Sequence, residues 1–494
     1  MPSPRRVRLI DVTLRDAHQC LWATRMTTAM MRDIAPLLDR AGFEAIDLVG
    51  GAVFDVMVRY LREDPWERMR ILSAWVTETP LIVHHRGQSL FTFEFFPDDV
   101  VERTAERIAA NGIRYHTLYD ALNDMRNLEV PVRAAKNVGL HTVGGLVYTH
   151  SPVHTDQYYT GKARELIALD VDGVFIKDPS GLLTPERVAT LVPALKAVCG
   201  ELPLQLHMHC LTGLAPYAAL QAVEHGVEVV HTATSVIANG ASHSPTELFT
   251  RNCRRRGHEV SIDLEPVEQA AEKLAFIAER EDKALGRPLE YEEFHFHHQV
   301  PGGMVSNLKY QLETMGIAER LEEILEEAGH VRADLGYPIV VSPFAQFIIT
   351  QAVLNVMGKD QGRERYATVP DEVRRYVMGG YGEIAGTIEP DLYDRIARGA
   401  EPATERPGAL VPPALERIRK ERGPFESDDD LLLAAFYGET EYGALKAAGP
   451  IDTDYALGPS PLVTLVKEIA ARPDIKSLRI TGRNGRRPRV GAAG

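Results

Sequence analysis

The chain has 494 residues and a formal net charge of −14, with 45% hydrophobic and 25% charged residues. This composition is ordinary for a globular protein of two or three domains, and the acidic charge argues against a nucleic-acid partner. Four cysteines without a CxxC pair, no signal-type apolar stretch after Met1 and no run of about 20 apolar residues predict a cytoplasmic protein without membrane insertion.

Strand-like and helix-like patterns alternate from Val7 to Thr232. Helices are expected between the strands, for example over Thr28–Ala41, Pro97–Asn111, Pro185–Val198 and Pro216–His225. This alternation favours an α/β fold of the (β/α)8 type, a TIM barrel, over an open doubly wound sheet. The eight expected strands are Val7–Asp11, Ala45–Val49, Leu81–His85, Tyr115–Tyr119, His141–Tyr148, Gly173–Lys177, Leu204–His209 and Glu228–Thr232.

Beyond about residue 265 the strand signals end, and the pattern predicts a mostly α-helical C-terminal domain. Ser342-Pro343 is typical of a helix cap followed by proline at the first helical position, and Gly379-Gly380 of a helix end. We therefore predict a barrel over 1–264, a helical domain over 265–425 and a C-terminal extension over 426–494. The last residues, from Gly482, are expected to be a disordered tail.

The loop after the first strand carries an arginine, an aspartate, a histidine and an amide in Thr13-Leu-Arg-Asp-Ala-His-Gln-Cys20. The carboxyl ends of barrel strands are where such folds carry out their chemistry. Asp16 offers a carboxylate there, and Asp11 at the end of the strand is an equally good candidate from sequence alone.

Two histidines mark the end of the seventh strand. His207 and His209 are two residues apart, so their side chains point to the same face and form half of a metal site. The alternative is a pair of half-buried histidines bonded to the backbone. With oxygen ligands added, two imidazoles suit zinc, cobalt or manganese better than magnesium or calcium.

Lys177 ends the apolar sixth strand, where burial would favour its neutral amine. A neutral amine can react with CO2 to give a carbamate, an anionic oxygen ligand. The alternative is a lysine paired with Asp178 or Asp172.

At this point the chain resembles the carboxyltransferase domains of biotin-dependent enzymes that act on pyruvate and oxaloacetate. The resemblance covers almost the whole chain and is closest to the transcarboxylase subunit and the oxaloacetate decarboxylase α subunit. It rests on motifs that occur in order: LRDAHQ (14–19), GGAVFDV (50–56), EDPWER (63–68), RGQ (86–88), DALND (120–124), YTHSPVHT (148–155), KDPSGLLTP (177–185), HMH (207–209) and PGGMVSNL (301–308).

The resemblance implies a role for each of several residues. Asp16, a carbamylated Lys177, His207 and His209 would hold the metal, and Arg15, Gln19 and Arg86 would hold the keto acid. Asp55 would lie close to the reacting centre, and the Ser306 hydroxyl would pass a proton between pyruvate and biotin. Gly51 and Phe93 would belong to the substrate pocket, and the helical domain would form the funnel for a biotin arm.

The chain departs from the family pattern around the expected keto-acid pocket. These departures leave the acceptor of the carboxyl group open while the ligands and the reaction class stay intact. They are Val49, Phe93, Val147, Cys210, His84 and His85, and strand alternation directs only one of the two neighbouring histidines inward.

The chain lacks a Met-Lys pair of the kind that carries biotin and a Gly-rich phosphate loop. The resemblance therefore implies a carboxyltransferase that exchanges a carboxyl group between carboxybiotin on a separate biotin carboxyl carrier protein and pyruvate or oxaloacetate, or that decarboxylates oxaloacetate. A divalent metal, zinc or alternatively cobalt or manganese, and a homo-oligomer, a dimer, are expected. The alternative is a lyase or Claisen-type condensing enzyme on the same barrel.

Overall fold

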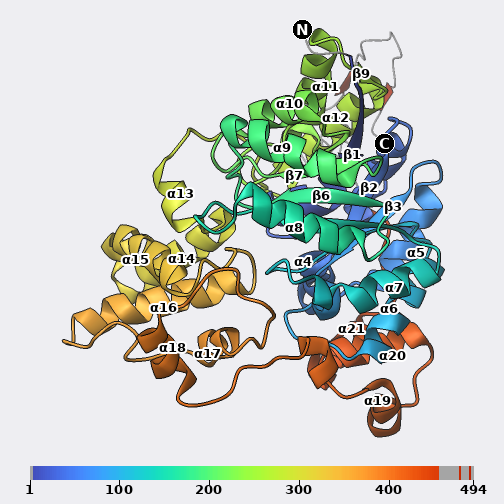
Figure 1. Ribbon diagram of the computed structural model, residues 1–494. Coiled ribbons are helices and arrows are strands. Elements are labelled where there is room, and N and C mark those ends of the chain that lie inside the picture. Colours follow the sequence, from blue (N-terminus) through green and yellow to red (C-terminus); the bar gives the residue numbers. More distant parts are fainter. Residues whose placement is uncertain (1–3, 456–477, 480–488, 491–494) are drawn as a thin grey trace. The chain divides into compact units, whose positions relative to one another are not determined.

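The computed structural model describes residues 4–455, 478–479 and 489–490. At residues 303, 306 and 307 and in the two short C-terminal segments it describes the backbone alone. Its core is a closed barrel of eight parallel strands, because β1 pairs with both β2 and β8. The short strand β9 adds to the outer end of β1. Figure 1 shows the barrel strands with their connecting helices around them. The predicted TIM barrel is confirmed.

The eight predicted strands all exist, and their ends differ from the prediction by at most one residue. Most of their residues are buried on both faces, as expected where helices cover the outside of a parallel sheet. The strands are β1 Arg6–Asp11, β2 Ala45–Gly50, β3 Leu81–His85, β4 Tyr115–Tyr119, β5 His141–Val147, β6 Gly173–Asp178, β7 Leu204–Met208, β8 Val229–Thr232 and β9 Glu259–Val260.

The helix predicted over Thr28–Ala41 is divided into two short helices, which corrects the prediction. Pro36 has no N–H to donate within a helix, and α3 begins beside it. The helices between the strands are α1 His18–Leu21, α2 Thr28–Met31, α3 Ala35–Asp39, α4 Gly51–Val56, α5 Pro65–Trp75, α6 Asp98–Ala110, α7 Glu129–Asn137, α8 Asp156–Ile167, α9 Pro185–Cys199, α10 Ala215–His225 and α11 Thr246–Arg255.

The chain is mostly helical after the barrel, as predicted. Pro343 takes the N-cap position of α16 and not the first helical position, and Ser342 makes no cap, so that detail of the prediction is wrong. The helices are α12 Leu264–Arg280, α13 Phe294–His298, α14 Gly302–Met315, α15 Leu321–Asp334, α16 Phe344–Lys359, α17 Asp371–Val377, α18 Pro390–Ala397, α19 Leu415–Arg422, α20 Asp428–Phe436 and α21 Glu439–Ala448.

Buried polar contacts join the start of the helical region to the barrel loops. Gln299 is 1% exposed, and its amide donates to His150 O while Thr149 Oγ1 donates to its Oε1. Ser180 Oγ donates to Gln299 O, and the Arg332 guanidinium donates to Thr149 Oγ1. These bonds fix the segment before α14 against the loops that follow β5 and β6.

Met1–Ile451 form one compact unit and Asp452–Gly494 a second, so the predicted boundaries at residues 264 and 425 stay predictions. Within the second unit, β10 Leu478–Arg479 pairs antiparallel with β11 Arg489–Val490. Except for Arg489 and Val490, the predicted disordered tail lies outside the described residues. None of the described helices has the length and apolar character needed to span a bilayer.

Candidate metal site and active site

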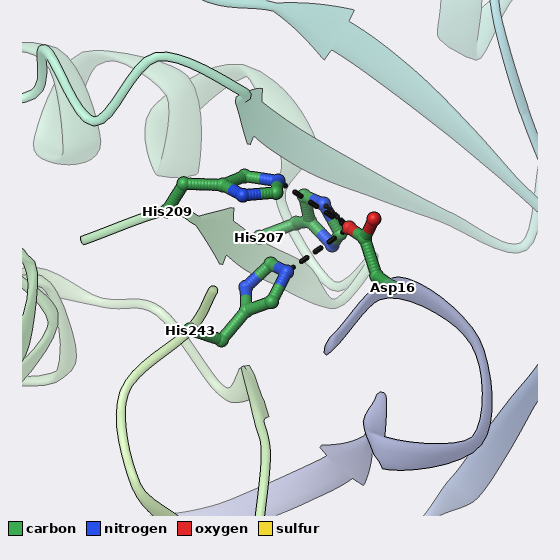
Figure 2. Close-up of side chains that lie close together, drawn as sticks. All are labelled: Asp16, His207, His209 and His243. Atoms are coloured by element: carbon green, nitrogen blue, oxygen red, sulfur yellow. Dashed lines mark hydrogen bonds and ion pairs between the residues drawn. The ribbon is translucent and has the colours of Figure 1, made fainter. Parts of the chain in front are cut away.

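Four buried side chains converge at the carboxyl end of the barrel. Asp16 comes from the single turn Thr13–Ala17 after β1, His207 from β7 and His209 from the residue after β7. Asp16 Oδ2 lies 3.0 Å from His207 Nε2, 3.3 Å from His209 Nε2 and 3.0 Å from His243 Nε2 (Figure 2). The structure therefore brings together three of the predicted ligands and adds a fourth side chain, His243.

The hydrogen bond behind His209 shows that a cation fits this cluster. His209 Nδ1 lies 2.7 Å from Ala241 O, and because a carbonyl only accepts, that nitrogen carries the proton. In the neutral imidazole, the lone pair of Nε2 then faces Asp16 Oδ2. Two acceptors directed at each other suit a metal ion between them, and a carboxylate with three imidazoles suits zinc, cobalt or manganese.

Asp11, the alternative carboxylate, is not part of the cluster. Its oxygens accept hydrogen bonds from Thr13 N at 3.0 Å and Thr13 Oγ1 at 2.7 Å. Burial raises the pKa of Asp11 to about 7, although the bonds from Thr13 oppose the shift. Asp11 closes the turn that carries Asp16, so its role is to hold the loop.

The raised pKa of Asp11 predicts a pH dependence of stability. The native state keeps a proton that the unfolded chain releases above about pH 4, so the free energy of unfolding falls as pH rises from about 4 to about 7. We expect Asp11→Asn to remove this part of the decline in urea unfolding at a series of pH values. Asp172→Asn is the control, because Lys136 lowers the pKa of Asp172 against the effect of burial. Parallel curves for the wild type and Asp11→Asn would contradict the assignment.

Lys177 lies beside the cluster, with Nζ 3.3 Å from His207 Nε2 and 5.0 Å from the centre of the Tyr119 ring. Burial, together with Arg15 and against Asp16, lowers its pKa to about 8. The alternative pairing partners are engaged elsewhere. Asp172 accepts from Lys136 Nζ at 2.6 Å, and Asp178 accepts from the backbone of Leu182 and Leu183. The alternative of an ion pair between Lys177 and either aspartate is therefore wrong.

A cavity of about 600 Å³ opens onto these groups. Arg15 lines it. Its Nη1 forms an ion pair with Asp16 Oδ1 at 2.9 Å, and two of its nitrogens donate to Asp47 Oδ2, so its guanidinium is held rigidly. Gln19 Nε2 donates to Asp16 Oδ1 at 3.1 Å. The cavity is lined by Arg15, Asp16, Gln19, Gly51, His84, Arg86, Lys177, His209, Pro301, Gly302 and Met304, among others.

Arg86 lines both this cavity and a second one. Its Nη1 donates to Thr92 O at 3.2 Å, and its Cζ lies 4.5 Å from the centre of the Phe93 ring. Gly51 faces it so closely that an added Cβ would lie 2.2 Å from Arg86 Nη1. Glycine at position 51 therefore leaves the space that the guanidinium occupies.

We expect Gly51→Ala to displace Arg86 and to raise the KM for the keto acid by about tenfold, since a misplaced charged group loses its bond to the substrate. Steady-state kinetics with varied keto acid check this. Gly161→Ala on α8 is the control, because its Cβ would meet nothing within 4 Å. An unchanged KM in Gly51→Ala would show that Arg86 does not bind the substrate.

Asp55 and Phe93 are not brought to the cluster. Asp55 accepts from Arg59 Nε at 2.8 Å and, with Phe93, lines the second cavity of about 590 Å³. Ser306 belongs to α14, but its side chain lies outside the described residues. The start of α14 lines the first cavity through Gly302 and Met304, so the helix itself reaches the site.

The two unusual histidines of β3 have different neighbours. His84 Nδ1 lies 2.7 Å from Thr117 Oγ1, and its ring stacks on Tyr119. His85 Nε2 instead lies 2.7 Å from His116 Nε2. His84 thus adds a polar side chain near Lys177. Both histidines line the first cavity, which corrects the prediction that only one of them faces inward.

Comparisons with known proteins identify the family of this chain. The sequence model of a protein family described as a conserved carboxylase domain matches residues 296–453. A second family model, described as HMGL-like, matches residues 116–274. The carboxyl transferase domain of Rhizobium etli pyruvate carboxylase, solved with pyruvate, superimposes with a TM-score of 0.84 at 26% identity over 92% of this chain and 81% of that chain.

Two curated relatives are similar over most of their own lengths. A pyruvate carboxylase subunit of Methanocaldococcus jannaschii is 40% identical over 92% of this chain and 80% of the relative. The methylmalonyl-CoA carboxyltransferase 5S subunit of Propionibacterium freudenreichii subsp. shermanii is 32% identical over 97% and 94%. The carboxylase model also covers the PGGMVSNL segment, which the lyase or condensing alternative leaves without a role. The chain belongs to the carboxyltransferase family of biotin-dependent carboxylases.

Proposed function

We propose that this carboxyltransferase moves a carboxyl group between carboxybiotin on a separate carrier protein and pyruvate or oxaloacetate. The observation that supports this most is the buried cluster of Asp16 and three histidines at a cavity that also contains Arg15, Arg86 and Lys177. The names of the relatives, a pyruvate carboxylase subunit and a carboxyltransferase subunit, support the same assignment and the need for partner subunits.

Asp16, His207 and His209 would hold a divalent metal, zinc or alternatively cobalt or manganese, which when bound polarises the keto oxygen of the substrate. Arg15 supplies a second, fixed positive charge where negative charge develops on that oxygen. Arg86 binds the substrate carboxylate with two parallel hydrogen bonds, and Gln19 holds Asp16 in place.

One proton moves from pyruvate to biotin as the carboxyl group moves from biotin to pyruvate. The bond between the biotin nitrogen and the carboxyl carbon breaks, and a bond from that carbon to the methyl carbon of pyruvate forms. The proton lost from the methyl carbon goes to the biotin nitrogen, and we assign its passage to the Ser306 hydroxyl, which can both donate and accept.

We further propose that Lys177 carries a carbamate, formed when its neutral amine takes up CO2 and releases a proton to solvent. The buried amine beside His207, without a carboxylate partner among the described residues, supports this. Asp55, which forms an ion pair with Arg59, would contribute to the reaction from the second cavity. A dimer and a cytoplasmic location stay predictions from the sequence.

Oxaloacetate decarboxylation by the purified protein tests the proposal. We expect free biotin to accelerate the release of pyruvate, because biotin is the acceptor of the carboxyl group. Desthiobiotin lacks the sulfur but keeps the ureido nitrogen, and it should substitute in part. A rate that biotin does not change would overturn the proposed carboxyl transfer.

A further inference from the structure

We infer that His243 is a metal ligand in this chain and that the metal is retained without Lys177. The inference rests on the proposed metal site and adds a fourth side-chain donor to it. Asp16, His207, His209 and His243 then form a complete set of one carboxylate and three imidazoles, and a carbamate on Lys177 would be an additional ligand.

His243 lies about as close to Asp16 as the two predicted histidines do. Its Nε2 lies 3.0 Å from Asp16 Oδ2, as close as that of His207 and closer than that of His209. The ligand atoms of all four residues lie within 4.8 Å of one another. Lys177 Nζ approaches His207 instead, so the amine is a neighbour of the set, and only carbamate oxygens would give it a ligand atom.

The loop after β8 holds His243 rigidly in this position. His243 forms an antiparallel bridge with His209, and Cys210 N donates to Ser242 O at 2.8 Å. Asn239 N donates to His243 O at 2.7 Å, in a turn where Asn239 has a φ of +64°. The imidazole is completely buried, so its orientation is set by packing before any metal binds.

The three imidazole rings lie close together. The His243 ring centre lies 4.4 Å from that of His207 and 4.2 Å from that of His209, around a single carboxylate. His243 Nδ1 has no partner among the described protein atoms, which leaves Nε2 as its one bonded nitrogen. Asp16 Oδ2 faces all three Nε2 atoms, and one divalent cation can bind all four groups.

Metal retention separates this arrangement from one that depends on the carbamate. The protein and its variants are loaded with Co2+, dialysed against a chelator and analysed by mass spectrometry for metal per chain and by visible absorption. We expect Lys177→Met to keep the metal and His243→Gln to bind it at least about tenfold more weakly. His330→Gln, at an exposed histidine, is the control.

Each outcome decides the inference. It is overturned if His243→Gln keeps the metal as the wild type does, or if Lys177→Met loses it. Thermal melts by circular dichroism, with His243→Asn as a second variant, distinguish metal loss from unfolding. A wild type that binds no metal would contradict the proposed function itself, which is a different result from a wild type that binds metal without His243.

Discussion

Replacing Asp16 with asparagine is expected to lower carboxyl transfer by about three orders of magnitude, or about 4 kcal/mol of transition-state stabilisation. Asp16 is the anionic centre of the cluster, because Oδ2 faces three imidazoles and Oδ1 forms an ion pair with Arg15. Arg15 holds its pKa well below the usual value although burial would raise it, so the side chain is a carboxylate at neutral pH. Asparagine keeps the size of the side chain but loses the charge.

Rates of transfer from free carboxybiotin, together with metal content, measure this effect. Asp172→Asn is the matched control, because that aspartate forms a partly exposed ion pair with Lys136 at the other end of the barrel strands. Activity of Asp16→Asn within tenfold of the wild type would show that the cluster is structural.

Arg86→Lys is expected to raise the KM for the keto acid about 10- to 100-fold, with a smaller change in kcat. Arginine can bind a carboxylate through two parallel N–H groups while its Nη1 also donates to Thr92 O. Lysine keeps the charge but offers a single point of contact, and the lost charged hydrogen bond corresponds to about 1.5–3 kcal/mol.

The changes in KM and kcat together show at which stage of the reaction Arg86 binds the substrate. A rise in KM at unchanged kcat means that Arg86 binds the ground state and the transition state equally. An equal fall in kcat and kcat/KM means that it acts only in the transition state. Arg133→Lys, in an exposed pair with Glu102, is the control and should leave both constants unchanged. Unchanged constants in Arg86→Lys would remove Arg86 from the substrate site.

The barrel can be predicted because its signals are local. Each strand is an apolar run bounded by turns, and the period of the pattern changes where the helices begin. The helix predicted over Thr28–Ala41 is too long because the apolar spacing continues through Pro36, while the missing N–H interrupts the hydrogen bonds. Pro343 lies one position earlier in its helix than predicted, a difference that spacing alone does not resolve.

The site can be predicted only in part. His207 and His209 are neighbours on one strand, and the family resemblance identifies Asp16. His243 stands alone in Gly240-Ala-Ser-His-Ser-Pro245, so no local spacing links it to the others. Its position depends on a bridge to His209 across two loops, which only the folded chain reveals. The choice between Asp11 and Asp16 likewise depends on which of the two carboxylates the turn at Thr13 directs into the cavity.

The central claim is that carboxyl transfer depends on one divalent cation at Asp16 and its histidines. Metal-free protein is titrated with Zn2+ or Co2+ while transfer from carboxybiotin to pyruvate is measured at each addition. The account predicts activity that rises in proportion to metal and stops rising at one ion per chain. Full activity in protein from which all metal has been removed would contradict it.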